Sequence, residues 1–122
     1  MAREPSEAAA HNFGFSRVWT VTVFASLCLA SPDEARAYLA ETFAPFLADA
    51  SSERAWLRGA QFGEVTDGVL PVSLFVFFRG EVEGGGPVPS WLRTLFRATD
   101  ILHPTGFGPV SPVYGMQTAA LP

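Results

Sequence analysis

The run from Val69 to Val82 constrains the fold more than any other part of this chain, because it is a long strand-like segment with two different faces. Side chains alternate between the two faces of a strand. One face is apolar at every position and must lie against a core; its residues are Leu70, Val72, Leu74, Val76 and Phe78. The other face is mixed, yet it carries Phe75 and Phe77, which need cover from water. The segment therefore predicts a long strand, which we call the central strand because the rest of the chain is arranged around it, and Pro71 within it is expected to mark a bulge or an edge position.

A second segment, from Ser16 to Leu29, repeats this design. Its mixed face includes Thr20, Thr22 and Phe24. Its other face is wholly apolar, with Trp19, Val21, Val23, Ala25, Leu27 and Leu29. Two strands of this kind indicate an antiparallel sheet that helices cover on one face only.

A tight turn is expected to connect the central strand to the strand before it. Asp67-Gly68 favours a two-residue hairpin loop, because this loop needs positive φ at both central positions. Such a loop pairs Thr66 with Val69. Counting back from this pair, the register predicts that Phe62 lies on the mixed face, with the phenylalanines of the central strand.

The first helix has a well-marked start. Ser31 is expected to be the N-cap, Pro32 occupies the first helical position, and Glu34 completes a capping-box pattern. Pro45 lies within the helical pattern and predicts a break near Ala44. The apolar stripe of this helix comprises Ala35, Tyr38, Leu39, Phe43, Phe46 and Leu47.

A second helix is expected over Trp91–Ile101, with Ser90 as its N-cap. A weaker strand is expected over Ala55–Thr66, and the Pro- and Gly-rich end of the chain predicts one short strand near Pro112–Thr118. The resulting order is the ferredoxin-like β-α-β-β-α-β order. We therefore expect an α+β fold in which helices cover one face of an antiparallel sheet.

The length of 122 residues predicts a single domain with two extended ends. A chain of this size buries about two-thirds of its unfolded surface, which is enough for a core without disulfides. We divide it into an N-terminal arm over residues 1–15, an α+β domain over residues 16–103, and an extended C-terminal tail over residues 104–122, with room for one last strand.

The apolar run Val18–Ala30 is similar in composition to the centre of a signal peptide. Against that interpretation, threonines alternate with its apolar residues, and acidic as well as basic residues precede it. The run is also too short to cross a bilayer. We therefore expect a cytoplasmic or particle-associated protein without a transmembrane segment.

Charge is sparse in this sequence. Charged residues make up 16% of the chain, against about a quarter in typical domains. All eight basic residues are arginines, and the net charge is −4. The negative charge argues against general nucleic-acid binding, whereas sparse charge and weakly hydrated arginines favour burial against a protein partner. A GC-rich coding sequence would also explain the missing lysines.

The residues that usually carry catalysis or bind metals are few and scattered. His11 and His103 are the two histidines, one in the arm and one before a proline. Cys28 is the single cysteine and is expected to be a small buried residue. Glu81 and Glu83 are expected to be solvated charges that protect the end of a strand. We therefore expect no catalytic residue, no metal site and no cofactor.

The aromatic residues on the mixed faces are the most informative feature for function. The opposite faces already supply the core. We therefore expect four phenylalanines on the face of the sheet that no helix covers: Phe24, Phe62, Phe75 and Phe77. Either the arms of the chain fold across these rings or the rings contact another protein. Burying three of them is worth roughly 5 kcal/mol or more, so exposure to water is unfavourable.

The leading hypothesis is therefore a non-enzymatic interaction or assembly subunit, which self-associates or binds another protein through the open face and its tails. A structural subunit of a particle such as a phage, or an acidic inhibitor-type protein, would fit this class. The alternative is a small ligand-binding or simple catalytic ferredoxin-like dimer with an apolar pocket. Its polar groups would be Tyr38, Trp91, His103 and Tyr114, with anion contacts from Arg93 and Arg97.

Overall fold

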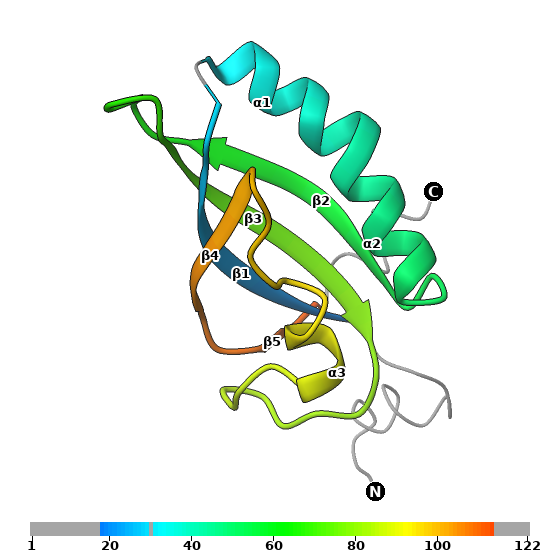
Figure 1. Ribbon diagram of the computed structural model, residues 1–122. Helices are drawn as coiled ribbons and strands as arrows, with labels where there is room; N and C mark the ends of the chain where they lie inside the picture. Colours follow the sequence, from blue (N-terminus) through cyan, green and yellow to red (C-terminus); the bar gives the residue numbers. More distant parts are fainter. Residues whose placement is uncertain (1–17, 30, 114–122) are drawn as a thin grey trace, which may run out of the picture.

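The computed structural model describes residues 18–29 and 31–113. The elements follow one another as β1 (Val18–Leu27), α1 (Pro32–Tyr38), the π-helical segment η2 (Leu39–Phe43), α2 (Ala44–Ala50), β2 (Ala55–Phe62), β3 (Leu70–Arg79), α3 (Ser90–Arg93), β4 (Leu102–Phe107) and β5 (Ser111–Pro112) (Figure 1). The predicted arm over residues 1–15 lies outside the described residues, as does the greater part of the strand predicted over Pro112–Thr118.

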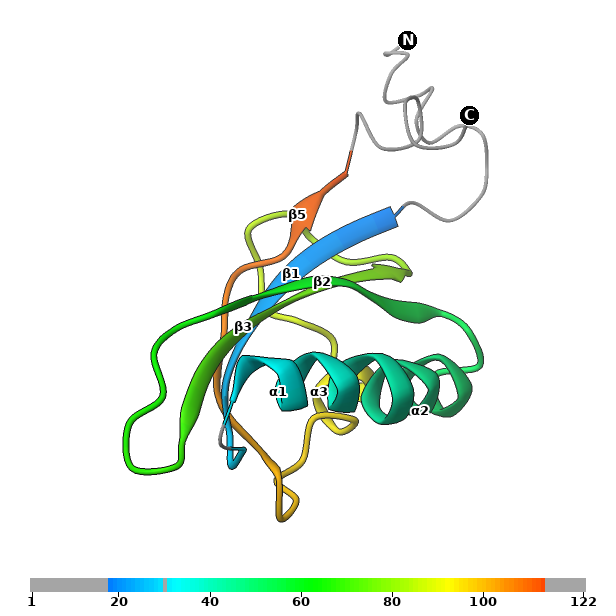
Figure 2. The ribbon, with the colours of Figure 1, turned by 90° about the horizontal axis from the view of Figure 1, so that it is seen from above.

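The strands form one antiparallel sheet in the order β2-β3-β1-β4, and β5 pairs with β1 as well. β1 and β3 lie at its centre, with Val21 opposite Val76. The apolar faces predicted for these two strands are confirmed, because their residues from Trp19 to Leu27 and from Leu70 to Phe78 are buried. Figure 2 shows the sheet edge-on, with α1, α2 and α3 all on one side of it.

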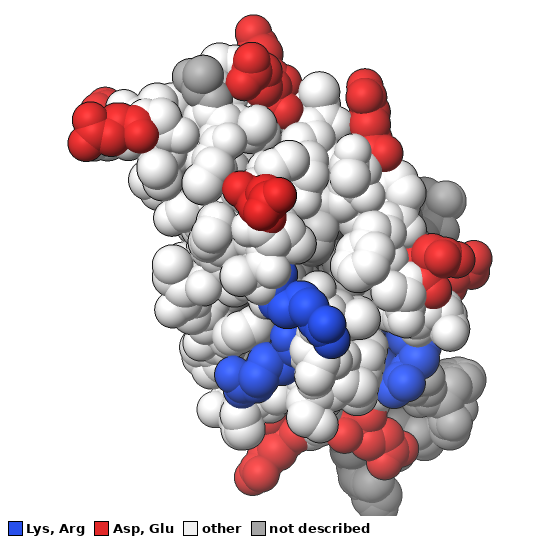
Figure 3. Space-filling view, viewed as in Figure 1, with Lys and Arg blue, Asp and Glu red and all other residues white. Residues whose placement is uncertain are grey.

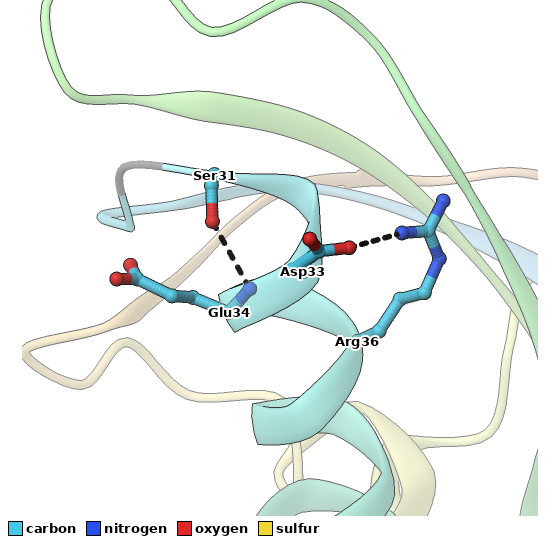
Figure 4. Close-up of polar contacts among 4 residues, drawn as sticks. All are labelled: Ser31, Asp33, Glu34 and Arg36. Carbon is cyan, nitrogen blue, oxygen red and sulfur yellow. Dashed lines mark hydrogen bonds and ion pairs between the residues drawn. The ribbon is translucent and has the colours of Figure 1, made fainter.

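The helical layer begins where the sequence predicts. The Ser31 side-chain oxygen accepts a hydrogen bond from the Glu34 backbone N–H at 3.2 Å, and Pro32 opens the first turn (Figure 4). An Arg36 guanidinium N–H donates to the Asp33 carboxylate at 3.1 Å on the exposed side of the same turn. The predicted N-cap is therefore confirmed, and it satisfies one of the free N–H groups at the helix start.

The break predicted at Pro45 is wrong, because α1, η2 and α2 form one helix of 19 residues. The helix absorbs the proline by widening: the Ala44 N–H donates to the carbonyl of Leu39, five residues back. This wider turn lies just where a proline ring would meet the carbonyl of an ordinary α-helix. It also suits the buried stripe, which recurs every four residues rather than about every 3.6: Ala35, Leu39, Phe43 and Leu47.

The predicted ferredoxin-like fold is also wrong. That fold packs two long helices on the sheet, whereas the described part of this chain has one long helix, of 19 residues. The second helix shrinks to the single turn α3, whose N-cap is Pro89 rather than Ser90. Local hydrogen bonds compete with a longer helix. The Thr94 hydroxyl donates to the Trp91 carbonyl at 2.9 Å, and the Thr99 hydroxyl accepts from the Leu102 N–H at 2.9 Å. The sheet also has five strands, so the molecule is an α+β fold of a different arrangement.

The position predicted for Phe62 is wrong by one residue of register. The hairpin loop is as expected, with Thr66 paired to Val69 and positive φ at Asp67 and Gly68. Between this pair and the body of β2 the pairing slips, so that Phe62 lies opposite Val72. A slip of one residue turns a side chain to the other face. Phe62 consequently packs on the helix side of the sheet, where Arg36 lies 5.3 Å from the centre of its ring.

Two segments of the predicted C-terminal region, residues 102–107 and 111–112, are strands of the sheet. β4 includes residue 103, where we expected the domain to end, and its one proline and one glycine give its sequence the pattern of an irregular segment. Such residues are tolerated at the edge of a sheet. Leu102 and Val110 from this region are buried in the core. Cys28, expected to be buried, is instead exposed just after β1.

Candidate functional site

The face of the sheet opposite the helices carries a group of aromatic residues, which we call the open sheet face. It consists of Phe24 from β1, Trp56 and Arg58 from β2, and Phe75, Phe77 and Arg79 from β3. Phe24 is 46% exposed, and Trp56, Phe75 and Phe77 are half-buried. The described helices all pack on the other side (Figure 2). Of the predicted interface residues, the structure therefore brings Phe24, Phe75 and Phe77 to one face and places Phe62 on the other.

The rings of this face are ordered by contacts with one another and with two arginines. Trp56 and Phe77 meet edge to face, with 6.0 Å between their ring centres. Arg79 lies over Trp56 at 4.7 Å, and Arg58 lies over Phe77 at 5.2 Å. Arg58 follows Trp56 by two residues in β2 and so lies on the same face, at the point where the pairing of β2 with β3 shifts between Leu57 and Gly59. The face thus presents apolar rings with flat, charged guanidinium groups held against them.

Small hydroxyl side chains separate the rings on this face. Thr20 pairs with Phe77, Thr22 pairs with Phe75, and Ser73 pairs with Phe24 across neighbouring strands. None of the five strands contains an aspartate or a glutamate. The face therefore combines apolar area, hydroxyl groups and positive charge, although the whole chain has a net charge of −4.

A second feature lies on the helix side, between α2 and the segment that joins α3 to β4; we call it the α2–α3 hollow. Its volume is about 590 Å³. Burial raises the pKa of the Tyr38 hydroxyl above its usual value, and a hydrogen bond with Thr99 opposes this shift. The lining residues are Tyr38, Thr42, Phe43, Phe46, Ala50, Thr94, Leu95, Arg97, Thr99 and Leu102.

The polar groups predicted for an apolar pocket do not gather in one place. Tyr38 lines the α2–α3 hollow, whereas Trp91 packs edge-on against Phe78, with 6.1 Å between the ring centres. His103 is exposed on β4, opposite Ser26. Tyr114 lies outside the described residues. Of the described residues, Tyr38 therefore lines the hollow, whereas Trp91 and His103 do not.

The two arginines predicted to contact an anion are also separated. Because α3 ends at Arg93, Arg97 does not follow it one turn later on the same helix. Arg93 lies over the ring of Phe107 at 4.9 Å, and Arg97 lines the α2–α3 hollow. Sequence reasoning missed Trp56, although the alternation of β2 that points to Arg58 would have placed it on the same face.

Metal-binding and membrane-spanning features are not found in the part of the chain that the structure describes. No group of three or more His, Cys, Asp or Glu side chains there is arranged to hold a metal ion. Within residues 18–29 and 31–113, no helix has the length and apolar character needed to cross a membrane.

Comparisons with known proteins give little further information. No protein-family model matches the sequence, and no curated protein matches it. Among solved structures, the full extracellular region of zebrafish Gpr126/Adgrg6 aligns with 80% of this chain at 11% sequence identity and a TM-score of 0.49. This chain spans 14% of that protein's length. A likeness of this size carries no inference about fold or function.

Proposed function

We propose that this chain is a non-enzymatic protein–protein interaction subunit, and that its open sheet face binds an apolar, acid-rimmed surface of another protein. The observation that supports this most directly is the group of four aromatic side chains on the side of the sheet without described helices. Aromatic residues and arginine are the types enriched at the centres of protein interfaces.

The apolar area of the face is large enough to matter for binding. Aromatic side chains bury about 150–250 Å² each when fully covered. Phe24 is 46% exposed and the other three rings are less exposed, so about 60 Å² per ring is still open and covering the four rings contributes about 6 kcal/mol. The loss of translational and rotational freedom on association costs about 4–15 kcal/mol. The burial of the rings alone thus offsets a large part of the free-energy cost of association, and polar contacts at the rim supply the rest.

Charge favours a different protein over a second copy of this chain. Arg58 and Arg79 lie on the face, and no strand residue provides a carboxylate to offset them. Their guanidinium groups lie over rings, and one Arg79 N–H donates to the Glu53 carbonyl at 3.3 Å. The remaining N–H groups can bind carboxylates of a partner. A second copy would bring the same positive face, although its whole chain has a net charge of −4. A partner with carboxylates around an apolar centre matches the face directly.

Site-specific photo-crosslinking in the cells that express the protein tests this proposal. A photoreactive phenylalanine analogue at position 77 is expected to form adducts with a distinct protein, and mass spectrometry of the adduct is expected to find acidic residues beside the crosslinked site. The same analogue at Phe46, which is 48% exposed on α2, is the control for accessibility. Arg58→Glu combined with Arg79→Glu should abolish the adduct at position 77.

A second measurement separates binding from folding and from self-association. Phe75→Glu combined with Phe77→Glu should leave the circular dichroism spectrum unchanged and remove any complex seen by sedimentation. Adducts at position 77 that join only residues of the same chain would show that the face is covered internally. Adducts with a second copy would replace the acidic partner with a homo-oligomer.

A further inference from the structure

The arginines of this chain share one structural role, with a single exception among the described residues. Five of the six arginines in this part of the chain lie over aromatic rings. The pairs are Arg36 with Phe62, Arg54 with Trp91, Arg58 with Phe77, Arg79 with Trp56 and Arg93 with Phe107, at 4.1–5.3 Å from guanidinium carbon to ring centre.

Arg97 is the exception. In the part of the chain that the structure describes, it has neither an aromatic ring beneath it nor a carboxylate beside it. Its Nε–H donates a long hydrogen bond of 3.5 Å to the Thr94 carbonyl, which leaves the two terminal nitrogens available. Figure 3 shows basic groups in the lower middle of this view, with acidic groups around its margins and just above the central basic group. The attraction for a small anion in the hollow therefore comes from Arg97 itself.

Arg97 is one wall of the α2–α3 hollow, and the other walls suit an apolar molecule. Phe43, Phe46, Leu95 and Leu102 supply apolar surface. Phe46 is 48% exposed although it follows the apolar stripe of its helix, so this ring lacks full cover. Of the described residues that line the hollow, none is an aspartate or a glutamate. The volume of about 590 Å³ lies within the range of about 300–1,000 Å³ that is usual for small-molecule sites.

We propose that the α2–α3 hollow binds a small amphipathic carboxylate, with its hydrocarbon part against Phe43, Phe46 and Leu95 and its carboxylate paired with Arg97. A guanidinium group binds a carboxylate through two parallel hydrogen bonds, which no neutral head group can match. The Tyr38 side chain lines the same space, and its hydroxyl, like that of any tyrosine with a pKa near or above 10, is uncharged at neutral pH. It therefore adds a hydrogen-bonding group without adding repulsion. The hollow and the open sheet face lie on opposite sides of the sheet, so the two proposals are independent.

A matched pair of ligands tests this proposal on the full chain. Decanoate and decanol have the same hydrocarbon chain and differ in the charge of the head group. Calorimetric titration and NMR shift mapping are expected to show that decanoate binds at the hollow at least tenfold more tightly than decanol. Arg97→Gln should reduce decanoate affinity about tenfold or more and leave decanol affinity unchanged, since a hydrogen bond to a charged group is worth about 1.5–3 kcal/mol.

Arg93→Gln is the matched control. It removes the same charge four residues before Arg97, from a side chain that lies over Phe107 rather than in the hollow. It should leave the affinity for both ligands unchanged. Equal binding of decanoate and decanol would overturn the proposal, as would an unchanged decanoate affinity in Arg97→Gln or shifts confined to residues outside the hollow. Failure of decanoate to bind at millimolar concentration would also overturn it. None of these results bears on the open sheet face.

Discussion

Replacing either of two neighbouring phenylalanines by alanine should lower the unfolding free energy by different amounts, because one lies on the core face of the sheet and the other on its open face. Phe77 and Phe78 are adjacent in β3 and point to opposite sides. Phe78→Ala is expected to cost about 3–5 kcal/mol of unfolding free energy, because it leaves a cavity in a packed interior. Phe78 is fully buried, and its ring meets Trp91 at 6.1 Å.

Phe77→Ala should cost much less, because only contacts on a half-buried surface are lost. The edge-to-face pair with Trp56 at 6.0 Å is worth about 0.5–1.5 kcal/mol. The contact with Arg58 at 5.2 Å is worth about 0.5–1 kcal/mol. Together these contacts predict a loss of about 1–2.5 kcal/mol.

Urea denaturation followed by circular dichroism measures both losses on the same scale. The reasoning requires the loss for Phe78→Ala to exceed the loss for Phe77→Ala by at least about 1 kcal/mol, with equal denaturant slopes. Losses of equal size would refute it, because they would mean that Phe77 is packed as tightly as the core. The open sheet face would then be an interior surface, and the proposed function would lose its main support.

Two further predictions concern the helical layer. Ser31→Ala should lower the unfolding free energy by about 1 kcal/mol, because the Glu34 N–H loses its acceptor; Ser90→Ala, at a position without a side-chain cap, should change it little in the same urea titration. Raising the pH should destabilise the wild type more than Tyr38→Phe. Burial raises the folded pKa of Tyr38 above the value of 10.0 expected for the unfolded chain, so its contribution is complete below that pH and is lost as the pH rises through the folded pKa. Urea midpoints between about pH 9 and 11 test this prediction, and parallel curves for the two proteins would contradict it.

The sequence predicts those features of the fold that depend on near neighbours. Alternation identifies the buried faces of β1 and β3, the spacing of Ser31 and Glu34 identifies the helix start, and Asp67-Gly68 identifies the hairpin. The prediction fails where a single hydrogen bond or one extra residue decides the outcome. The slip beside Gly63, whose N–H donates to the Pro71 carbonyl at 2.9 Å, moves Phe62 to the other face.

The candidate site is predictable to a similar extent. Phe24, Phe75 and Phe77 follow from alternation alone, because the pairing of β1 with β3 is regular around them. Alternation also places Arg58 and Arg79 on this face, whereas the ring that each guanidinium contacts depends on how β2 pairs with β3, which the sequence alone does not give. The α2–α3 hollow could not be foreseen, because it exists only where α3 stops after one turn.

The irregular course of β2 also affects how copies of this chain meet at high concentration. β2 is the last strand at one end of the sheet, and no described strand pairs with its outer edge. A straight, unpaired edge invites strands from other molecules and leads to fibrous aggregates. The shift between Leu57 and Gly59, and the slip near Gly63, interrupt the ladder of β2 twice within a few residues. A strand from another molecule could pair with β2 in register for only a short distance. We therefore expect this chain to resist fibrous aggregation through its sheet edge, even though its open sheet face can bind another protein.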